Sequence, residues 1–285
     1  MTSPWRSAGM RLKAALGGLL AASADLQAAP PAGPASDPHD SQPSPPQIPG
    51  NWKLLWHDEF EGDSLNPIWH PCQYWDHDHT IIGKGELQAF DASAFSVAHS
   101  LLSITCREDA HYEHGTKYVS GLCMTGGERD APHSPNFSFL HGYAEVRAKI
   151  PASSGLWPAV WLMPASYHDV AGEIDVVEIL AEEPRKAYFT THRNGHQEQR
   201  NVTGADLSQD FHIYAIDWQP THLHWYLDGK RVATCTDLKR VCEEAMYPIL
   251  SLAVGDGTVW GAAPNAQTKF PAVMQVDYVR VWQMA

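Results

Sequence analysis

The strongest constraint on the fold is an alternation of apolar and polar residues with a period of two. In residues 142–150, Tyr, Glu, Arg and Lys occupy one set of alternate positions, and Ala, Val, Ala and Ile occupy the other. This is the period of a β-strand with one polar and one buried face. Residues 276–282 form a further strand-like run rich in Val, Tyr and Trp. Because helical periodicity is hard to find after residue 50, we expect an all-β fold.

A tight hairpin is the clearest local signal. The strand-like runs 223–227 and 230–234 are joined by Asp228-Gly229, a pair strongly favoured in two-residue hairpin turns. Only residues 238–246 suggest a brief helix. The number of short strands favours two large sheets over a small barrel. We therefore predict a two-sheet antiparallel β-sandwich.

The first residues have the layout of a secretory signal peptide. Basic residues precede a small apolar run at 14–24, and residues 22–24 and 26–28 both resemble signal-peptidase sites. The apolar run is roughly half of what a membrane-spanning helix needs. We expect residues 1–28 to be a signal peptide and the protein to be secreted, extracellular or periplasmic, without a membrane partner.

A linker and one domain follow. Residues 29–50 contain eight prolines among Ser, Asp, Gln and Gly, a composition that favours extended, solvated backbone. Residues 51–285 are long enough for one substantial core, and all-β sandwiches commonly reach this size undivided. We predict a single domain over 51–285, and a monomer.

Charge narrows the range of partners. The formal net charge is −13, and the basic residues form no cluster, so a phosphate backbone would be repelled. The charge therefore excludes nucleic acid as an expected partner. Among polysaccharides it favours neutral glycans, since a strongly anionic chain would meet the same repulsion.

Five cysteines leave the disulfide pattern open. In an exported chain disulfides are plausible, and both Cys106 with Cys123 and Cys235 with Cys242 are candidate pairs. Two bridges can be drawn from five cysteines in fifteen ways, and Cys72 is the fifth. The chain has no CxxC or Cys/His spacing of a zinc site, so we interpret the cysteines as structural.

One predicted strand carries three acids. Residues 172–180 are rich in β-branched residues, which favours a strand. In a regular strand Glu173 and Asp175 would share one face, and Glu178 would be buried unpaired on the other, which is costly. One extra residue at 176–177, forming a β-bulge, would bring all three acids to one side.

Three carboxylates on one face suit one kind of chemistry. Their mutual repulsion makes at least one hold its proton more firmly than in water. Glycoside hydrolysis needs this combination, because a carboxylate attacks the anomeric carbon while a protonated partner donates to the departing oxygen. The predicted strand therefore indicates a glycosidase active site.

The run Glu173-Ile-Asp-Val-Val-Glu178 resembles the signature of glycoside hydrolase family 16, the laminarinase and lichenase family, in its bulged form. The resemblance extends over most of the domain. The other segments that carry it, in order, are residues 56–60, 85–88, 142–147, 155–161, 211–214 and 276–282. It implies a concanavalin-like jelly roll with a concave substrate cleft. It also implies a retaining endo-glycosidase with Glu173 as nucleophile, Glu178 as acid and base, and Asp175 between them.

The resemblance further implies a set of substrate-binding residues. These are Trp161, Trp157, Glu145, Arg147, His192, Trp260 and Glu86. Core packing is an equal alternative for Trp157, an exposed ion pair is the alternative for Glu145 with Arg147, and a turn cap is the alternative for Glu86.

Many members of the family hold one calcium ion on the convex side. Here the resemblance assigns it to the Asp277 carboxylate and the Glu59 carbonyl. Calcium prefers six to eight oxygen ligands, and only one candidate side chain is evident. We therefore expect a structural ion at most, and no cofactor in catalysis.

Departures from the family pattern leave the substrate open. Residues 167–171 replace a usual tryptophan and proline, Lys84 replaces asparagine, and Leu122 replaces arginine. The first hypothesis is a β-1,3-glucan or a mixed β-1,3/1,4-glucan as substrate. The alternatives are another polysaccharide such as a galactan or xyloglucan, a transglycosylase, and a non-catalytic glycan-binding domain.

Overall fold

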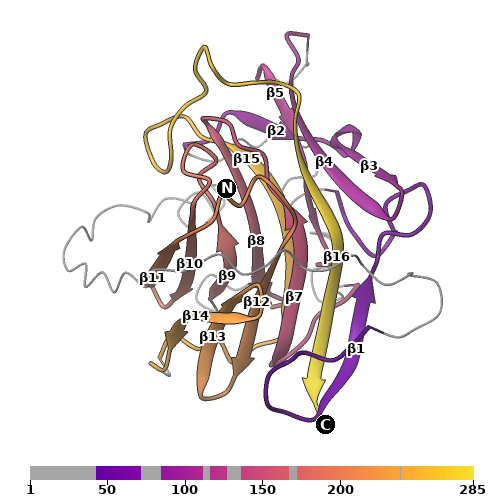
Figure 1. The fold of residues 1–285 in the computed structure, drawn as a ribbon, viewed down its shortest axis with the longest axis vertical. Helices are drawn as coiled ribbons and strands as arrows, with labels where there is room; N and C mark the ends of the chain where they lie inside the picture. Colours follow the sequence, from indigo (N-terminus) through magenta and orange to yellow (C-terminus); the bar gives the residue numbers. More distant parts are fainter. Residues whose placement is uncertain (1–42, 72–84, 112–115, 127–135, 167–171, 238) are drawn as a thin grey trace, which may run out of the picture.

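The computed structural model describes residues 43–71, 85–111, 116–126, 136–166, 172–237 and 239–285 (Figure 1). The predicted signal peptide, most of the predicted linker, Cys72, Lys84 and residues 167–171 lie outside these ranges. Among the described residues, no helix is both long and apolar enough to cross a membrane.

Two sheets make up the fold. The larger has ten strands, in the order β14-β13-β12-β7-β16-β4-β5-β2, with β1 paired to β16 and β3 paired to β4. Their bounds are β1 Trp52–Asp58, β2 Gln88–Phe90, β3 Phe95–Ala98, β4 Leu101–Glu108, β5 Tyr118–Ser120, β7 Gly142–Lys149, β12 His212–Gln219, β13 His222–Leu227, β14 Lys230–Cys235 and β16 Ala272–Met284.

The smaller sheet has six strands in the order β11-β10-β9-β8-β15-β6. Their bounds are β6 Leu122–Met124, β8 Leu156–Pro164, β9 Glu173–Glu178, β10 Lys186–Arg193, β11 His196–Thr203 and β15 Met246–Val254. Apart from the parallel pair β2 and β5, the strand pairings in the described part of the chain are antiparallel. The predicted all-β antiparallel sandwich is confirmed, and the one helical element there is the 3-10 turn η2, Ala92–Ala94.

The core lies between the two sheets. Ala144, Val146 and Ala148 of β7 are buried in it, while the intervening Glu145 and Arg147 are half-buried on the other side of the strand. The alternation seen in the sequence is therefore the division between the inner and outer faces of the larger sheet. The inner face of the smaller sheet supplies apolar residues of β8 and β9 to the same core.

The predicted hairpin is present as β13 and β14. Asp228 and Gly229 have φ of 50° and 74°, the paired positive angles of a type I′ turn. Asp228 also accepts hydrogen bonds from the Ile213 backbone N–H at Oδ1, 2.9 Å away, and pairs with His212 Nδ1 at 2.7 Å through Oδ2. The turn is thereby tied to the start of β12.

The brief helix suggested at 238–246 is not found in residues 239–245, which form turns and bends, and Met246 begins β15. The first turn of a helix is unfavourable to form, and a short helix makes too few hydrogen bonds to offset this free energy. Here Arg240 instead pairs through its side chain with Glu198 of β11, at 3.2 Å.

The candidate disulfides do not form. Cys106, Cys123 and Cys235 are buried with free thiols, and Cys242 is buried as well. Cys106 lies in β4 of the larger sheet and Cys123 in β6 of the smaller one. Burial raises the pKa of the Cys106 thiol to about 12 and that of Cys123 well above its usual value, so these thiols stay protonated and unreactive.

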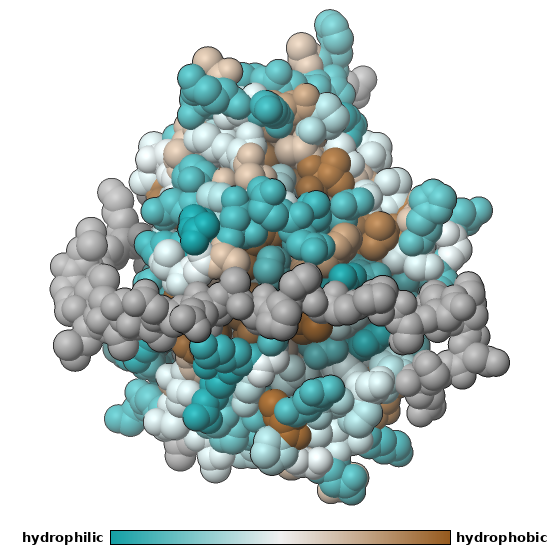
Figure 2. Space-filling view, viewed as in Figure 1, coloured by the Kyte–Doolittle hydropathy of each residue, from teal (hydrophilic) through white to brown (hydrophobic). Residues whose placement is uncertain are grey.

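The last part of the predicted linker is packed against the domain. Ile48 and Trp52 contact an outer-face cluster on the larger sheet that contains Tyr143, Tyr226 and Trp282. The Trp52 indole donates a hydrogen bond to the Ile48 carbonyl at 3.3 Å. Outside the grey atoms, the face in Figure 2 is mainly hydrophilic, with small separate hydrophobic patches.

We predict that Gly229→Ala lowers the free energy of unfolding by about 1 kcal/mol, because a left-handed backbone disfavours a side chain. A Cβ on Gly229 would meet no atom within 4 Å. Gly142→Ala, whose Cβ would clash with the Trp282 carbonyl oxygen, should cost clearly more. Urea unfolding measures both free energies. Equal losses in the two variants would contradict the close packing of Gly142 against Trp282.

Candidate active site

Strand β9 contains the predicted bulge. Opposite β8, Asp175 and Val177 pair with the consecutive residues Trp161 and Val160, so that Val176 is the extra residue. The register with β10 shifts in the same stretch. The bulge changes which face each later residue occupies.

All three acids share the outer face of the smaller sheet as a result. Glu173 and Glu178 are half-buried, and Asp175 is buried. The residues between them, Ile174, Val176 and Val177, belong to the hydrophobic core. Neither glutamate points into the apolar interior, which a regular strand would have required of Glu178.

A tryptophan from the opposite sheet holds the bulge. The indole N–H of Trp225, in β13, donates to the backbone carbonyl of Asp175 at 2.8 Å. Trp225 is 1% exposed, so this hydrogen bond crosses the core. A bulge disrupts the local ladder of hydrogen bonds, and a buried carbonyl there requires another donor. Trp225 supplies it.

Residues of β10 lie directly opposite the three acids of β9. Tyr188 pairs with Glu178, Thr190 with Asp175, and His192 with Glu173. The Thr190 hydroxyl donates to Glu178 Oε2 at 3.1 Å. The Glu178 carboxyl therefore has a fixed partner on the neighbouring strand.

His192 lies beside the other two acids, Asp175 and Glu173. Its Nε2 lies 3.2 Å from Asp175 Oδ2 and 3.6 Å from Glu173 Oε1. The Asp175 side chain is 5% exposed, against 34% for Glu173. We predicted that His192 contacts the substrate. In the structure its ring lies beside Asp175 and Glu173, and contact with a substrate stays a prediction.

The cluster holds protons more firmly than isolated groups would. Burial and the charge of Asp175 raise the pKa of Glu173 to about 7. The same two causes raise the pKa of Glu178 well above its usual value. Burial opposes the charge of His192, but the carboxylates, Glu173 first, outweigh it and raise the His192 pKa to about 10. At neutral pH the site therefore combines a His192 imidazolium with two glutamates that hold their protons more firmly than they would in water.

Three predicted aromatic residues lie on the same face. Trp161 pairs with Asp175 across the ladder, and its indole donates to Ser251 Oγ at 3.2 Å. The rings of Trp157 and Trp260 are 6.4 Å apart. Trp260 also meets Tyr188 edge-on at 5.0 Å, beside Glu178.

Glu86 lies at the end of this aromatic group. It forms an isolated β-bridge with Gly255, at the start of the loop that carries Trp260. Its Oε2 accepts a hydrogen bond from Gln88 at 2.6 Å. The structure thus brings Glu86 to the Trp260 loop, and whether it contacts a ligand stays a prediction.

Glu145 and Arg147 were predicted near the same ligand, and this prediction is wrong. They lie on the outer face of the larger sheet, on the opposite side of the sandwich from the acids. Arg147 pairs with Asp277 at 2.6 Å and stacks over Phe211 at 4.7 Å. The alternative, an exposed ion pair between Glu145 and Arg147, is not found either, since Arg147 pairs with Asp277.

Of the predicted calcium ligands, the Asp277 carboxylate already accepts a charge-assisted hydrogen bond from Arg147. The Glu59 carbonyl stays a prediction, and the Glu59 carboxylate receives two hydrogen bonds from Arg280, each 2.8 Å long. Within the described residues, neither acid belongs to a cluster of metal-ligating side chains. A calcium ion would have to displace a guanidinium and find most of its six to eight oxygens elsewhere.

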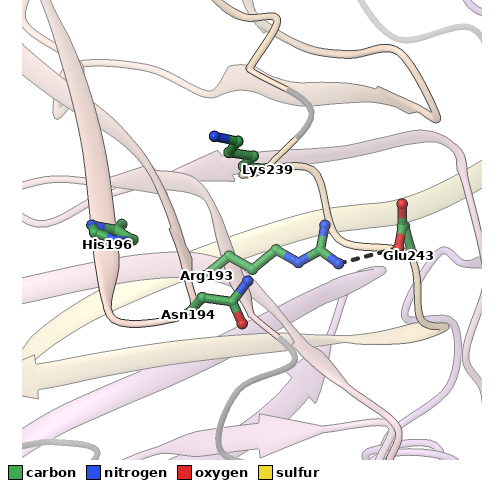
Figure 3. Close-up of a pocket in the computed structure, with 5 residues that line it drawn as sticks. All are labelled: Arg193, Asn194, His196, Lys239 and Glu243. Carbon is green, nitrogen blue, oxygen red and sulfur yellow. Dashed lines mark hydrogen bonds and ion pairs between the residues drawn. The ribbon is translucent and has the colours of Figure 1, made fainter.

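A separate pocket of ≈ 450 Å³ lies at the turn between β10 and β11, just beyond His192 (Figure 3). Its lining residues are Arg193, Asn194, His196, Lys239 and Glu243. An ion pair of 3.2 Å between Arg193 and Glu243 crosses it (Figure 3). None of the three acids lines this pocket.

Sequence reasoning missed Thr190, Tyr188 and Trp225. The first two occupy alternate positions before His192, so the strand period could have placed them beside the acids once His192 was chosen. Trp225 had no such signal, because its partner lies fifty residues away in the other sheet.

An antiparallel sandwich with paired acids on one outer face is the architecture of a jelly-roll carbohydrate-active protein. A family model described as "Glycosyl hydrolases family 16" matches residues 95–280. The chain belongs to this family, as the sequence motifs indicated.

Two of its relatives are named as glucan-degrading enzymes. The chain is 30% identical over 276 residues to "Glucan endo-1,3-beta-glucosidase A1" of Niallia circulans, a match covering 85% of this chain and 39% of that protein. It is 28% identical over 261 residues to "Beta-glucanase" of Rhodothermus marinus, covering 82% and 86%. The chain thus spans well under half of the first relative and most of the second.

A solved structure agrees with the fold. The endo-beta-1,3-glucanase from Pyrococcus furiosus superposes with a TM-score of 0.73 and 31% identity, covering 82% of this chain and 95% of that one. The jelly-roll architecture expected from the sequence is confirmed.

We predict that Trp225→Phe lowers the free energy of unfolding by about 1–3 kcal/mol, because the Asp175 carbonyl is left buried without its donor. It should also shift the His192 titration, followed by NMR, since the bulge holds Asp175 beside that ring. Trp218→Phe is the matched control: it removes an equally buried indole, whose acceptor is the Cys242 carbonyl at 3.1 Å. If both variants leave the His192 titration unchanged, Trp225 does not position the acids.

Proposed function

We propose that this protein is a secreted, retaining endo-glycosidase that hydrolyses β-1,3-glucan or mixed β-1,3/1,4-glucan by double displacement. The observation that carries the proposal is the shared outer face of Glu173, Asp175 and Glu178 on the bulged strand β9. The names of the relatives, which refer to glucanases, support the choice of glucan.

In this mechanism Glu173 is the nucleophile. Its carboxylate attacks the anomeric carbon as the bond to the leaving oxygen breaks, giving a covalent glycosyl-enzyme. Glu178 donates its proton to that oxygen in the same step. Glu178 then takes a proton from water, whose oxygen displaces Glu173 from the anomeric carbon. The sugar is released with its original configuration, and both acids return to their starting states.

The electrostatics support this division of roles. A proton donor must be protonated at working pH, and the raised pKa of Glu178 satisfies this condition. A nucleophile must be ionised, and the charge of His192 lowers the Glu173 pKa against burial and Asp175. His192 thus favours the ionised nucleophile.

The spacing along the strands is compatible with retention. The β10 partners of Glu173 and Glu178 are four residues apart, which corresponds to roughly 13 Å between backbone positions. Two glutamate side chains that lean toward each other from these positions can approach the about 5–5.5 Å used by retaining enzymes.

The aromatic residues support endo-cleavage of a chain. Trp161 lies beside Asp175, and Trp157 and Trp260 lie beyond Glu178. Aromatic faces pack against the flat C–H faces of sugars. A row of them that runs from Asp175 past Glu178 would hold several sugars of one chain beside the cleaved bond.

Other readings remain distinct from this proposal. Hydrolysis of a galactan or xyloglucan, or transglycosylation, would use the same acids with a different cleft shape and water access. A non-catalytic glycan-binding domain would not need the raised pKa of the Glu178 carboxyl group. We further propose export through residues 1–28 and action as a monomer on polysaccharide.

We predict that Glu178→Gln lowers kcat about 10²–10⁴-fold by removing the proton donor, and that Glu173→Gln loses at least as much because no glycosyl-enzyme can form. Reducing ends released from laminarin, lichenan, barley glucan, agarose and xyloglucan measure this. Glu145→Gln, on the opposite face, is the matched control. Full activity of Glu173→Gln would end the mechanism, and an initial α-anomer in proton NMR would end the retaining assignment.

We predict a bell-shaped pH dependence of kcat/KM. Activity should fall as pH drops below the Glu173 pKa of about 7, and fall again as pH rises through the raised pKa of Glu178. His192→Gln should move both limbs to higher pH, since the His192 charge lowers both pKa values. His196→Gln, an exposed histidine on the next strand, is the control. Unmoved limbs in His192→Gln would contradict this account.

A further inference from the structure

A second group of ligating side chains lies far from the acids. It consists of Asp217 in β12 and His222 and His224 in β13. The intervening residue Leu223 is buried in the core. The two histidines therefore point away from the core on the outer face of the larger sheet. Strands β12 and β13 lie side by side in the lower part of Figure 1.

The ligating atoms converge. Asp217 Oδ2 is 3.2 Å from His222 Nε2 and 3.8 Å from His224 Nδ1. One ligand atom from each of the three residues lies within 4.8 Å of the others. The imidazole rings stack at 3.9 Å with an interplanar angle of 25°. Asp217 and His224 are directly opposite in the antiparallel register, so the sheet itself sets this geometry.

The remaining polar atoms of two members have their own partners. Gln219 Nε2 donates to Asp217 Oδ1 at 2.8 Å, which leaves Oδ2 facing the histidines. His222 Nδ1 lies 3.0 Å from Thr221 Oγ1, which leaves Nε2 facing Asp217. Contacts of this kind on the atoms that do not ligate are what orient histidine and carboxylate ligands in metal sites.

The distances match a small borderline metal ion. Zinc bonds to histidine nitrogen and carboxylate oxygen are about 2.0–2.2 Å long, and its sites are nearly always tetrahedral, so neighbouring ligand atoms stand roughly 3.3–3.5 Å apart. The two distances to Asp217 lie just below and just above this range. Small side-chain rotations would equalise them. Two imidazoles also select zinc, copper or nickel over calcium and magnesium, which favour oxygen.

We propose that Asp217, His222 and His224 form a zinc-type divalent metal site on the outer face of the larger sheet, with water as the remaining ligand. The three side chains are 10%, 22% and 18% exposed, so the site is half-enclosed and open to solvent on one side. The ion links β12 to β13, the strand from which Trp225 reaches the bulge. Its role is structural, and it is independent of the proposed hydrolase activity.

The test uses the full mature chain, stripped of metal with EDTA and dialysed. Isothermal titration with Zn²⁺ should show one site per chain, and saturating Zn²⁺ should raise Tm by roughly 5–10 °C, since a ligand that binds only the folded state stabilises it. Co²⁺ in place of Zn²⁺ should give the visible absorption of a four-coordinate ion.

Three variants separate this site from its rival. His222→Gln with His224→Gln, and independently Asp217→Asn, should abolish the binding event and the shift in Tm. His192→Gln disrupts the other ligating group, formed with Glu173 and Asp175, and should leave both unchanged. Circular dichroism checks that each variant folds.

Each opposite outcome overturns the proposal. These are no Zn²⁺ binding by the wild-type chain, binding that survives the loss of both histidines, and binding that disappears only in His192→Gln. Absence of binding by the wild-type chain would mean that the histidines simply share N–H hydrogen bonds with Asp217. This result needs no variant, so a misfolded variant cannot leave the proposal undecided.

Discussion

The hydrogen bond from the Trp225 indole to the Asp175 carbonyl joins the two sheets at the bulge of β9. The extra residue in that strand decides whether Glu178 is an outer-face acid or a charge buried in apolar surroundings. Because the donor comes from the opposite sheet, packing of the core and presentation of the acids are not independent. A change that shifts β13 would be felt at the acid face without touching it.

The second requirement is that three carboxylates share a small surface. Crowding makes some of them hold protons, and His192 limits that effect by placing a positive charge 3.2 Å from Asp175. Thr190 gives Glu178 a hydrogen-bond donor in the same register. The outward-facing residues of β10 thus influence the charge state of the acids on β9. A shift of the β9–β10 register by one residue would break all three pairings between the acids and β10.

Local patterns predicted much of this structure, and contacts between sheets account for what they did not predict. Alternation in residues 142–150 defined a strand with two faces, and Asp228-Gly229 defined a hairpin. The burial cost of Glu178 was sufficient to predict the bulge. Alternation cannot say which outer face carries the ligand, so it offered no check on the family resemblance, which had placed Arg147 near the sugar instead of beside Asp277.

The path of residues 43–50 has a further meaning for long polymers. Ile48 and Trp52 anchor this stretch against Tyr143 and Trp282, on the side of the sandwich that faces away from the acids. The polypeptide therefore enters the domain from behind the surface on which sugars would lie. A long polymer lying across the acid face would therefore not meet this entry segment.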